Sequence, residues 1–99
     1  MEPANHYIRF SVSPPNTDAL TLRKALQDAL SQTFGLVAAN TYIDILWVAE
    51  DGTEVVLRVA RSNAQRVLSA VAASAAYPRL SLVKSSAFLP SLLSVEPLS

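Results

Sequence analysis

The chain has 99 residues, about half of them apolar, with eight basic and eight acidic side chains. This length supports one compact domain and leaves no room for a second. A net charge of zero argues against a protein that binds nucleic acid on its own by neutralising many phosphates. The absence of cysteine from the sequence excludes disulfides, thiolate metal sites and thiol nucleophiles, and suits a reducing compartment.

The charges are unevenly distributed along the chain. Residues 1–51 carry three basic and six acidic side chains, whereas residues 52–99 carry five basic and two acidic ones. We therefore expect a molecule with a positive and a negative end. The first ten residues lack the pattern of a secretory signal, and no apolar run is long enough to span a bilayer. We expect a soluble protein inside the cell with no membrane partner.

A strand and a helix are the first expected elements. Residues 6–13 alternate apolar and polar side chains, which is typical of a half-buried strand, and the two prolines that follow end it. Residues 17–34 carry an apolar stripe with a spacing of four, made of Leu22, Leu26 and Leu30. This stripe predicts an amphipathic helix packed on a sheet. Gly35 is expected to end the helix, because glycine adopts a left-handed conformation without steric cost.

A β-hairpin is expected next. Residues 41–49 and 53–60 flank Asp51-Gly52, a dipeptide that favours the two-residue type I′ turn. With that turn, alternation places Leu46 and Val48 on the core side with Val55, Leu57 and Val59. The opposite, open face of the sheet would carry Ile43, Ile45, Trp47, Val56 and Arg58. Asp44 falls on the core side, where we expect a hydrogen bond to backbone, to Arg9 or to Arg58.

A second helix and a last strand complete the expected elements. Ser62 and Gln65 form the pattern of a capping box, and an apolar stripe continues toward Tyr77-Pro78, made of Val67, Leu68, Val71, Ala72 and Ala75. Residues 79–87 are expected to form a strand with Leu80 and Leu82 inward. Residues 88–99 are apolar but interrupted by prolines, so we expect an irregular or disordered tail.

This order of elements predicts an α+β, ferredoxin-like (RRM-like) β-α-β-β-α-β sandwich with both helices on one face of a four-stranded antiparallel sheet. We expect a single domain over residues 1–99, with its core in residues 6–87. The open face is too apolar to meet only water, which predicts a protein interface made of Ile43, Ile45, Trp47 and Val56. The alternative is that the tail of residues 88–98 folds over this face.

The sequence offers little support for catalysis. His6 is the only histidine and has no partner visible in the sequence, and two glycines are too few for a phosphate-binding loop. We expect no enzyme activity of its own, no cofactor and no metal. The open face lacks the aromatic residues of an RRM. The candidates for RNA contact are therefore basic side chains, namely Arg58, Arg61, Arg66, Arg79 and Lys84. The alternative is a solvated rim in which such side chains pair with Glu50, Asp51 and Glu54.

Two runs of the sequence, "LRKALQDALSQTFGLVAA" and "VLRVARSNAQRVLSAV", carry a family resemblance. Over residues 7–85 the chain resembles the small α/β protein subunits of ribonuclease P and ribonuclease MRP. Its neutral charge and its ending "KSSAFLPSLL" resemble the smaller, divergent and fungal type of subunit rather than the larger, basic one.

The resemblance implies an accessory subunit that forms a heterodimer with a paralogous α/β subunit and joins the other proteins of the ribonucleoprotein. The catalytic RNA, contacted directly or through partners, would remove the 5′ leader of precursor tRNA or process precursor rRNA. Arg58 and Arg61 would lie near that RNA. The expected location is the nucleus and nucleolus.

Two alternatives of other classes remain open. One is a small dimerising subunit of a tRNA-modification complex of the KEOPS kind. The other is a ligand-sensing regulatory domain of ferredoxin-like fold, in which a small molecule would bind at an interface. A homodimer without RNA would favour the first, and a thermal shift with metabolites would favour the second.

Overall fold

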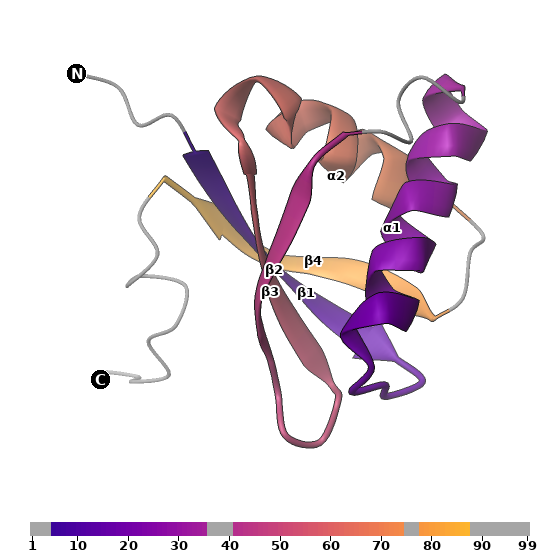
Figure 1. Cartoon of the computed structure of the whole chain (residues 1–99), viewed down its shortest axis with the longest axis vertical. Helices are drawn as coiled ribbons and strands as arrows, with labels where there is room; N and C mark the ends of the chain where they lie inside the picture. Colours follow the sequence, from indigo (N-terminus) through magenta and orange to yellow (C-terminus); the bar gives the residue numbers. More distant parts are fainter. Residues whose placement is uncertain (1–4, 36–40, 75–77, 88–99) are drawn as a thin grey trace.

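A computed structural model describes residues 5–35, 41–74 and 78–87 of the chain. The elements are β1 (Asn5–Ser13), α1 (Ala19–Phe34), β2 (Ile43–Val48), β3 (Glu54–Ala60), the short 3-10 helix η2 (Arg61–Asn63), α2 (Ala64–Ala73) and β4 (Arg79–Ser86). The strands form one antiparallel sheet in the order β2-β3-β1-β4, and α1 and α2 lie side by side on one of its faces (Figure 1). The predicted α+β, ferredoxin-like fold is confirmed. The expected tail, residues 88–99, lies outside the described residues.

The hydrophobic core lies between the sheet and the two helices. The largest fully buried side chains on its two sides are Ile8, Phe10, Leu22, Leu26, Leu30, Ile43, Val55, Leu57, Val59 and Val67. Each such side chain contributes on the order of 1.5–3 kcal/mol relative to leaving it exposed. Alternation in β1 and β3 and the four-residue spacing in α1 place these side chains on facing surfaces, and their burial is the main driving force for folding.

Helix α1 begins and ends close to where its sequence predicts. Asp18 caps it by accepting hydrogen bonds from Leu20 N at 3.2 Å and from Thr21 Oγ1 at 2.7 Å. At the other end Gly35 has φ of 95°, and its N–H donates to the Ser31 carbonyl at 2.8 Å. The prediction that Gly35 ends the helix with a positive φ is confirmed, since that φ is one that other residues rarely adopt.

The β2–β3 hairpin is confirmed, but the predicted type I′ turn at Asp51-Gly52 is wrong. Gly52 N donates to the Ala49 carbonyl at 2.9 Å, so the turn is centred one residue earlier, on Glu50 and Asp51. Gly52 has φ of 73°, and its carbonyl accepts a hydrogen bond at 2.8 Å from the Asn16 N–H of the β1–α1 loop. This tertiary contact fixes the hairpin end against the start of α1.

A shift of register in β2 changes which side chains face the helices. Val48 lies opposite Val55 and Trp47 opposite Val56, as predicted, but the register then shifts between Ile45 and Trp47. Beyond the shift, Ile43 and Ile45 lie on the core face, where Ile43 is buried and Ile45 packs against the core. The prediction that these two isoleucines line the open face is therefore wrong. Strict alternation places them there because it does not include the extra residue of a β-bulge.

The same bulge moves two further side chains of β2. Leu46 is 37% exposed and does not join the core, contrary to prediction. Asp44 lies opposite Arg58 on the open face and pairs with it. The predicted core-side position of Asp44 is wrong, whereas its pairing with Arg58 was one of the expected alternatives.

Four predicted details of α2 and β4 are also wrong. Ser62 lies within η2, and the N-cap of α2 is Asn63, which makes no side-chain capping bond, so the capping box does not form. The helix ends at Ala73, before the predicted Tyr77, and Ala72 is exposed. Leu80 is buried as predicted, but Leu82 is 53% exposed because β4 is an edge strand whose register shifts at this point.

Candidate functional site

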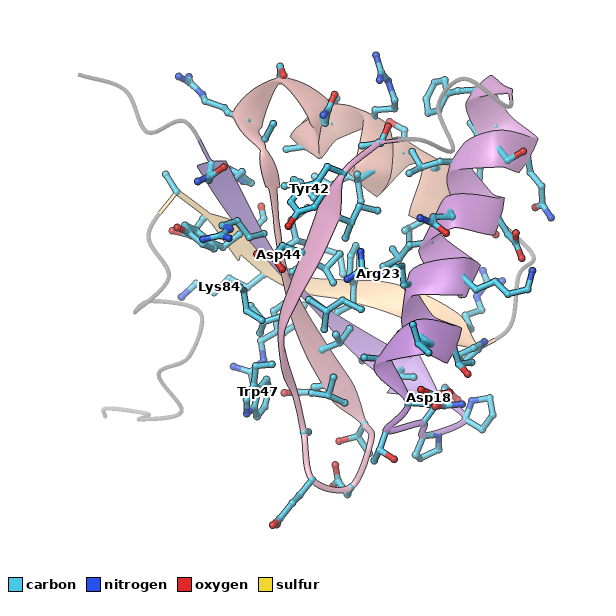
Figure 2. The ribbon with its side chains drawn as sticks, viewed as in Figure 1. Asp18, Arg23, Tyr42, Asp44, Trp47 and Lys84 are labelled. Carbon is cyan, nitrogen blue, oxygen red and sulfur yellow. The ribbon has the colours of Figure 1, made fainter. Side chains whose placement is uncertain are left out.

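The open face of the sheet is built from two rows of side chains that cross all four strands. The register aligns one row as Trp47, Val56, Arg9 and Lys84, and the next as Asp44, Arg58, Tyr7 and Ser86. Figure 2 shows Trp47 and Lys84 on the side of the sheet away from α1, whereas Arg23 reaches the sheet from α1. The strands therefore bring two aromatic side chains, Trp47 and Tyr7, and three cations together on one surface.

Val56 lies at the centre of this face and is fully buried, although it faces away from the helices. Its neighbours in the row account for its burial. The Arg9 guanidinium carbon lies 5.8 Å from the Trp47 ring centroid, so the Arg9 side chain passes over Val56 to reach the ring. Trp47 itself is 40% exposed. At the centre of the open face, the Arg9 side chain thus covers the apolar Val56, and the Trp47 indole ring lies beside them.

The two arginines of the open face are held by carboxylates of the same face. Arg9 Nε donates to Glu54 Oε1 at 2.8 Å, and its Nη2 pairs with the same oxygen. Arg58 pairs with Asp44 on the neighbouring strand. Both pairs are only partly exposed, with between 16% and 40% of each side chain accessible. Their positive charges are therefore largely balanced within the sheet.

The five basic residues predicted to contact RNA do not form one patch. Arg58 and Lys84 lie on the open face, whereas Arg61 lies in η2 and Arg66 on the exposed side of α2. In the strand register, Arg79 lies opposite Ser13 at one end of β1, and Arg58 lies opposite Tyr7 near the other end. The two positions are on the order of 20 Å apart along the strand. Arg9 was not among the predicted site residues. Its alternation onto the open face, beside Trp47 and Glu54, is the signal that could have found it.

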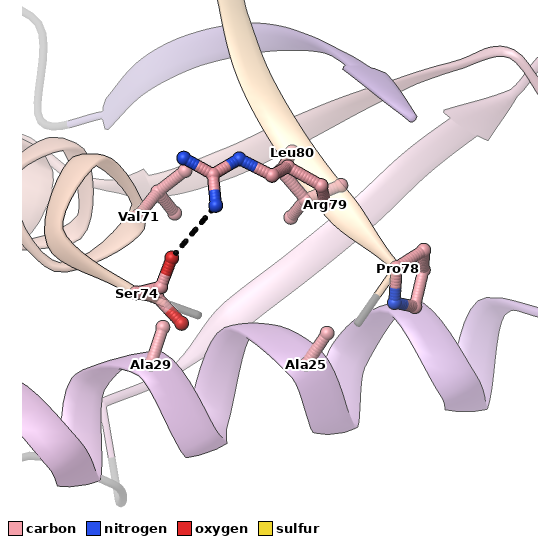
Figure 3. A pocket seen from close by; sticks show the side chains of 7 residues that line it. All are labelled: Ala25, Ala29, Val71, Ser74, Pro78, Arg79 and Leu80. Atoms are coloured by element: carbon pink, nitrogen blue, oxygen red, sulfur yellow. Dashed lines mark hydrogen bonds between the residues drawn. The ribbon is translucent and has the colours of Figure 1, made fainter. Parts of the chain in front are cut away.

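A shallow apolar groove lies between α1, the end of α2 and the start of β4 (Figure 3). Its lining residues are Ala25, Ala29, Val71, Ser74, Pro78, Arg79 and Leu80. Across it Arg79 Nη1 donates to the Ser74 carbonyl at 3.4 Å. Arg79 is thus engaged with the backbone at the end of α2.

Groups of ionisable side chains are sparse in the described part of the chain. Within residues 5–35, 41–74 and 78–87, no three histidine, aspartate or glutamate side chains converge in a way that could hold a metal ion. Hydrogen bonds from the Thr53 hydroxyl and N–H hold the pKa of Asp51 below its ordinary value. Asp51 lies in the hairpin turn, away from Trp47. None of the described helices combines the length and the apolar character that crossing a membrane requires.

Together, the fold and the open face define a small α+β protein with a ferredoxin-like sheet and one amphipathic, charge-paired sheet surface. Residues 5–73 match a family model described as "Ribonucleases P/MRP protein subunit Pop8". The chain belongs to this family of ribonuclease P/MRP protein subunits, which confirms the resemblance found in the sequence.

A comparison with solved structures gives the same fold. A chain of the structure titled "Cryo-EM structure of yeast Ribonuclease MRP" is similar to this protein, with a TM-score of 0.74 and 18% sequence identity. The match covers 100% of this chain and 83% of that chain. No curated protein gives a significant match.

Proposed function

We propose that this subunit has no catalytic side chains and pairs with a paralogous α/β subunit through the open face of its sheet. The pair, with the other proteins of the complex, supports the RNA that removes the 5′ leader of precursor tRNA or processes precursor rRNA. The proposed place of action is the nucleus and nucleolus. Family membership supports the complex, and the half-exposed Trp47 stacked with Arg9 over Val56 is the observation that supports the surface.

The composition of the open face favours a protein partner over RNA. Tryptophan, tyrosine and arginine are the residues most enriched at the energetic centres of protein interfaces. Of the predicted interface, Trp47 is accessible to a partner, whereas Val56 lies buried beneath the Arg9 side chain. Tyr42, which is 69% exposed beside β2, extends the accessible surface. The carboxylates Glu54 and Asp44 neutralise Arg9 and Arg58, so these two arginines offer little net charge to a phosphate backbone, and the carboxylates' oxygens can still accept hydrogen bonds from a partner's polar side chains.

The outer edge of β2 is poorly suited to receive an additional strand. An Arg23 guanidinium N–H donates to the carbonyl of Ile43, so this acceptor of the edge strand is already engaged by α1. The bulge at Leu46 interrupts the regular spacing a few residues further on. Natural proteins use such features to block edge-to-edge pairing. On the β2 side of the sheet, a partner is therefore expected to dock on the open face rather than to add a strand.

The experiment is an affinity purification of the tagged chain from nuclear extract, with identification of the bound protein and RNA. We expect the wild-type chain to recover a paralogous α/β subunit together with the ribonuclease P or MRP RNA. Trp47→Glu should lose both, because it places a charge where the partner buries the indole. Leu20→Glu is the matched control, since Leu20 is 74% exposed at the start of α1 and should retain both.

Two outcomes would contradict the proposal. One is recovery of the partner by Trp47→Glu at the wild-type level while the variant is folded by circular dichroism. The other is a homodimer without RNA, which is the result expected of a dimerising tRNA-modification subunit. The family match favours the ribonuclease P/MRP subunit over that alternative and over a ligand-sensing domain.

A further inference from the structure

The end of the molecule where α1 finishes and α2 begins carries an exposed aromatic ring. Phe34 is the last residue of α1, and 47% of its surface is accessible although it is one of only three phenylalanines in the chain. The guanidinium carbon of Arg66, on α2, lies 5.9 Å from the centroid of its ring. The Phe34 ring of α1 thus contacts Arg66 of α2 on the surface and does not enter the core.

The charge of Arg66 is not balanced by a carboxylate in the described part of the chain. Arg66 contacts the Phe34 ring and Asn63 Oδ1, which lies 3.5 Å from its Nη1. No aspartate or glutamate occurs in residues 61–73, and the turn of α1 before Phe34 has the neutral sequence Ser31-Gln32-Thr33. Arg61 adds a second cation in η2. Arg66 therefore differs from Arg9 and Arg58, whose charges are held by carboxylates.

Three acidic side chains lie at the opposite end of the molecule. The Asn16–Gly52 hydrogen bond joins the hairpin turn to the loop before α1, and Figure 1 shows both segments at the end where α1 begins. Asp18 belongs to that loop, and Glu50 and Asp51 belong to the turn. The carboxylates of Asp18, Glu50 and Asp51 therefore lie at the end of α1 away from Phe34 and Arg66. An anionic ligand is attracted to the end that carries Phe34 and Arg66.

We infer that Phe34 and Arg66 form a contact site for a single-stranded segment of RNA, in which a base stacks on the Phe34 ring and Arg66 faces the adjoining phosphate. The inference rests on the proposed function, which brings RNA to the chain. An aromatic ring beside an arginine accepts bases of any sequence, because every base has a π-face and the guanidinium can stack or bind phosphate.

The surroundings of the ring favour RNA over a second protein surface. Energetic centres of protein interfaces are packed within a contiguous apolar patch. The three residues that precede Phe34 in α1, Ser31, Gln32 and Thr33, are polar, and the side chain that contacts its ring from α2 is the cationic Arg66. An exposed aromatic ring beside a cationic side chain and polar side chains is the environment in which a nucleic-acid base stacks.

The test is RNA binding by the complex reconstituted from this chain, its partner proteins and transcribed ribonuclease MRP RNA at about 150 mM salt. We expect Phe34→Ala and Phe34→Leu each to weaken RNA affinity about tenfold, since a stacked base is worth roughly that factor or more. Phe34→Tyr retains the π-face and should bind within about twofold of wild type. Arg66→Gln should lower the slope of log RNA affinity against log salt concentration by about one, as expected for the loss of one phosphate contact.

The leucine variant separates stacking from packing, because it keeps apolar bulk and loses the ring. Wild-type RNA affinity of Phe34→Leu or of Phe34→Ala would overturn the inference, as would loss of a partner protein with unchanged RNA affinity. Leu20→Ala, at an exposed apolar position at the other end of α1, should have no effect. If the wild-type complex binds no RNA, the proposed function fails. If the wild-type complex binds RNA and the Phe34 variants bind it equally well, only the present inference fails.

Discussion

The two ends of the molecule differ in how the chain is held. At the hairpin end, backbone hydrogen bonds of 2.8 Å join Asn16 to Gly52 and Val12 to Thr53, and a Cβ on Gly52 would lie 2.6 Å from Asn16 N. At the helix end, a Cβ on Gly35 would meet nothing within 4 Å, and α2 begins without a side-chain cap. A glycine with positive φ thus serves tight packing at one end and helix termination at the other. The tightly held end is acidic, and the more open end carries Arg61, Arg66 and the exposed Phe34.

Substitution of the two glycines by alanine should give the largest difference between the ends. Gly52→Ala adds the cost of a positive φ to a clash with the Asn16 backbone, and we expect a loss of about 2–4 kcal/mol in the free energy of unfolding. Gly35→Ala should lose less, about 1–2 kcal/mol, because alanine meets no neighbouring atom there and only the conformational cost of φ 95° and ψ 174° applies. Urea denaturation of both variants measures the difference. Equal losses would show that the hairpin end is not held as described.

Charge reversal should distinguish the open face from the helix end. Arg58→Glu removes the pair with Asp44 and places two carboxylates on directly opposite residues, so we expect a loss of about 1 kcal/mol in unfolding free energy. Arg61→Glu, at an exposed position of η2, should change it by no more than about 0.5 kcal/mol. The measurement is chemical denaturation at low salt and again at high salt, where the effect of Arg58→Glu should shrink. A larger effect for Arg61 would contradict the assignment of Arg58 to an internal charge pair.

The smallest effect is expected at the hairpin turn. The pKa of Asp51 is lowered in the folded chain by the Thr53 hydrogen bonds, so the ionised form stabilises the fold above about pH 4 and this contribution is lost as pH falls through the folded pKa. Thr53→Val removes the hydroxyl donor and should raise the pKa of Asp51 toward its ordinary value. An NMR titration of the Asp51 carboxyl group measures the shift. An unchanged pKa in the variant would show that the hydroxyl does not hold the carboxylate.

The sequence predicts the fold because the strongest signals in it are regular. Alternation predicts β1, and the leucine spacing predicts α1. The turn residues predict the β2–β3 hairpin, and the buried faces of all these elements meet in one core. The family resemblance adds the ribonuclease P/MRP assignment, which no single motif in the sequence would have supplied.

The open face could be predicted only in part, because its composition depends on one extra residue in β2. Trp47 and Val56 are correctly placed, since they lie between the turn and the bulge, where the register from the turn still holds. Ile43, Ile45 and Asp44 lie beyond the bulge and exchange faces. Pairing between Arg9 and Glu54 and the contact of Arg66 with Phe34 join residues distant in the sequence, so local patterns do not reveal them.

The central claim is that Trp47 meets a protein subunit on the open face of the sheet. The most direct test replaces Trp47 with the photoreactive residue p-benzoylphenylalanine in the assembled complex and identifies what becomes attached on irradiation. We predict a crosslink to a paralogous α/β protein subunit. A crosslink to the RNA, or none in a complex that still contains the chain, would contradict the claim.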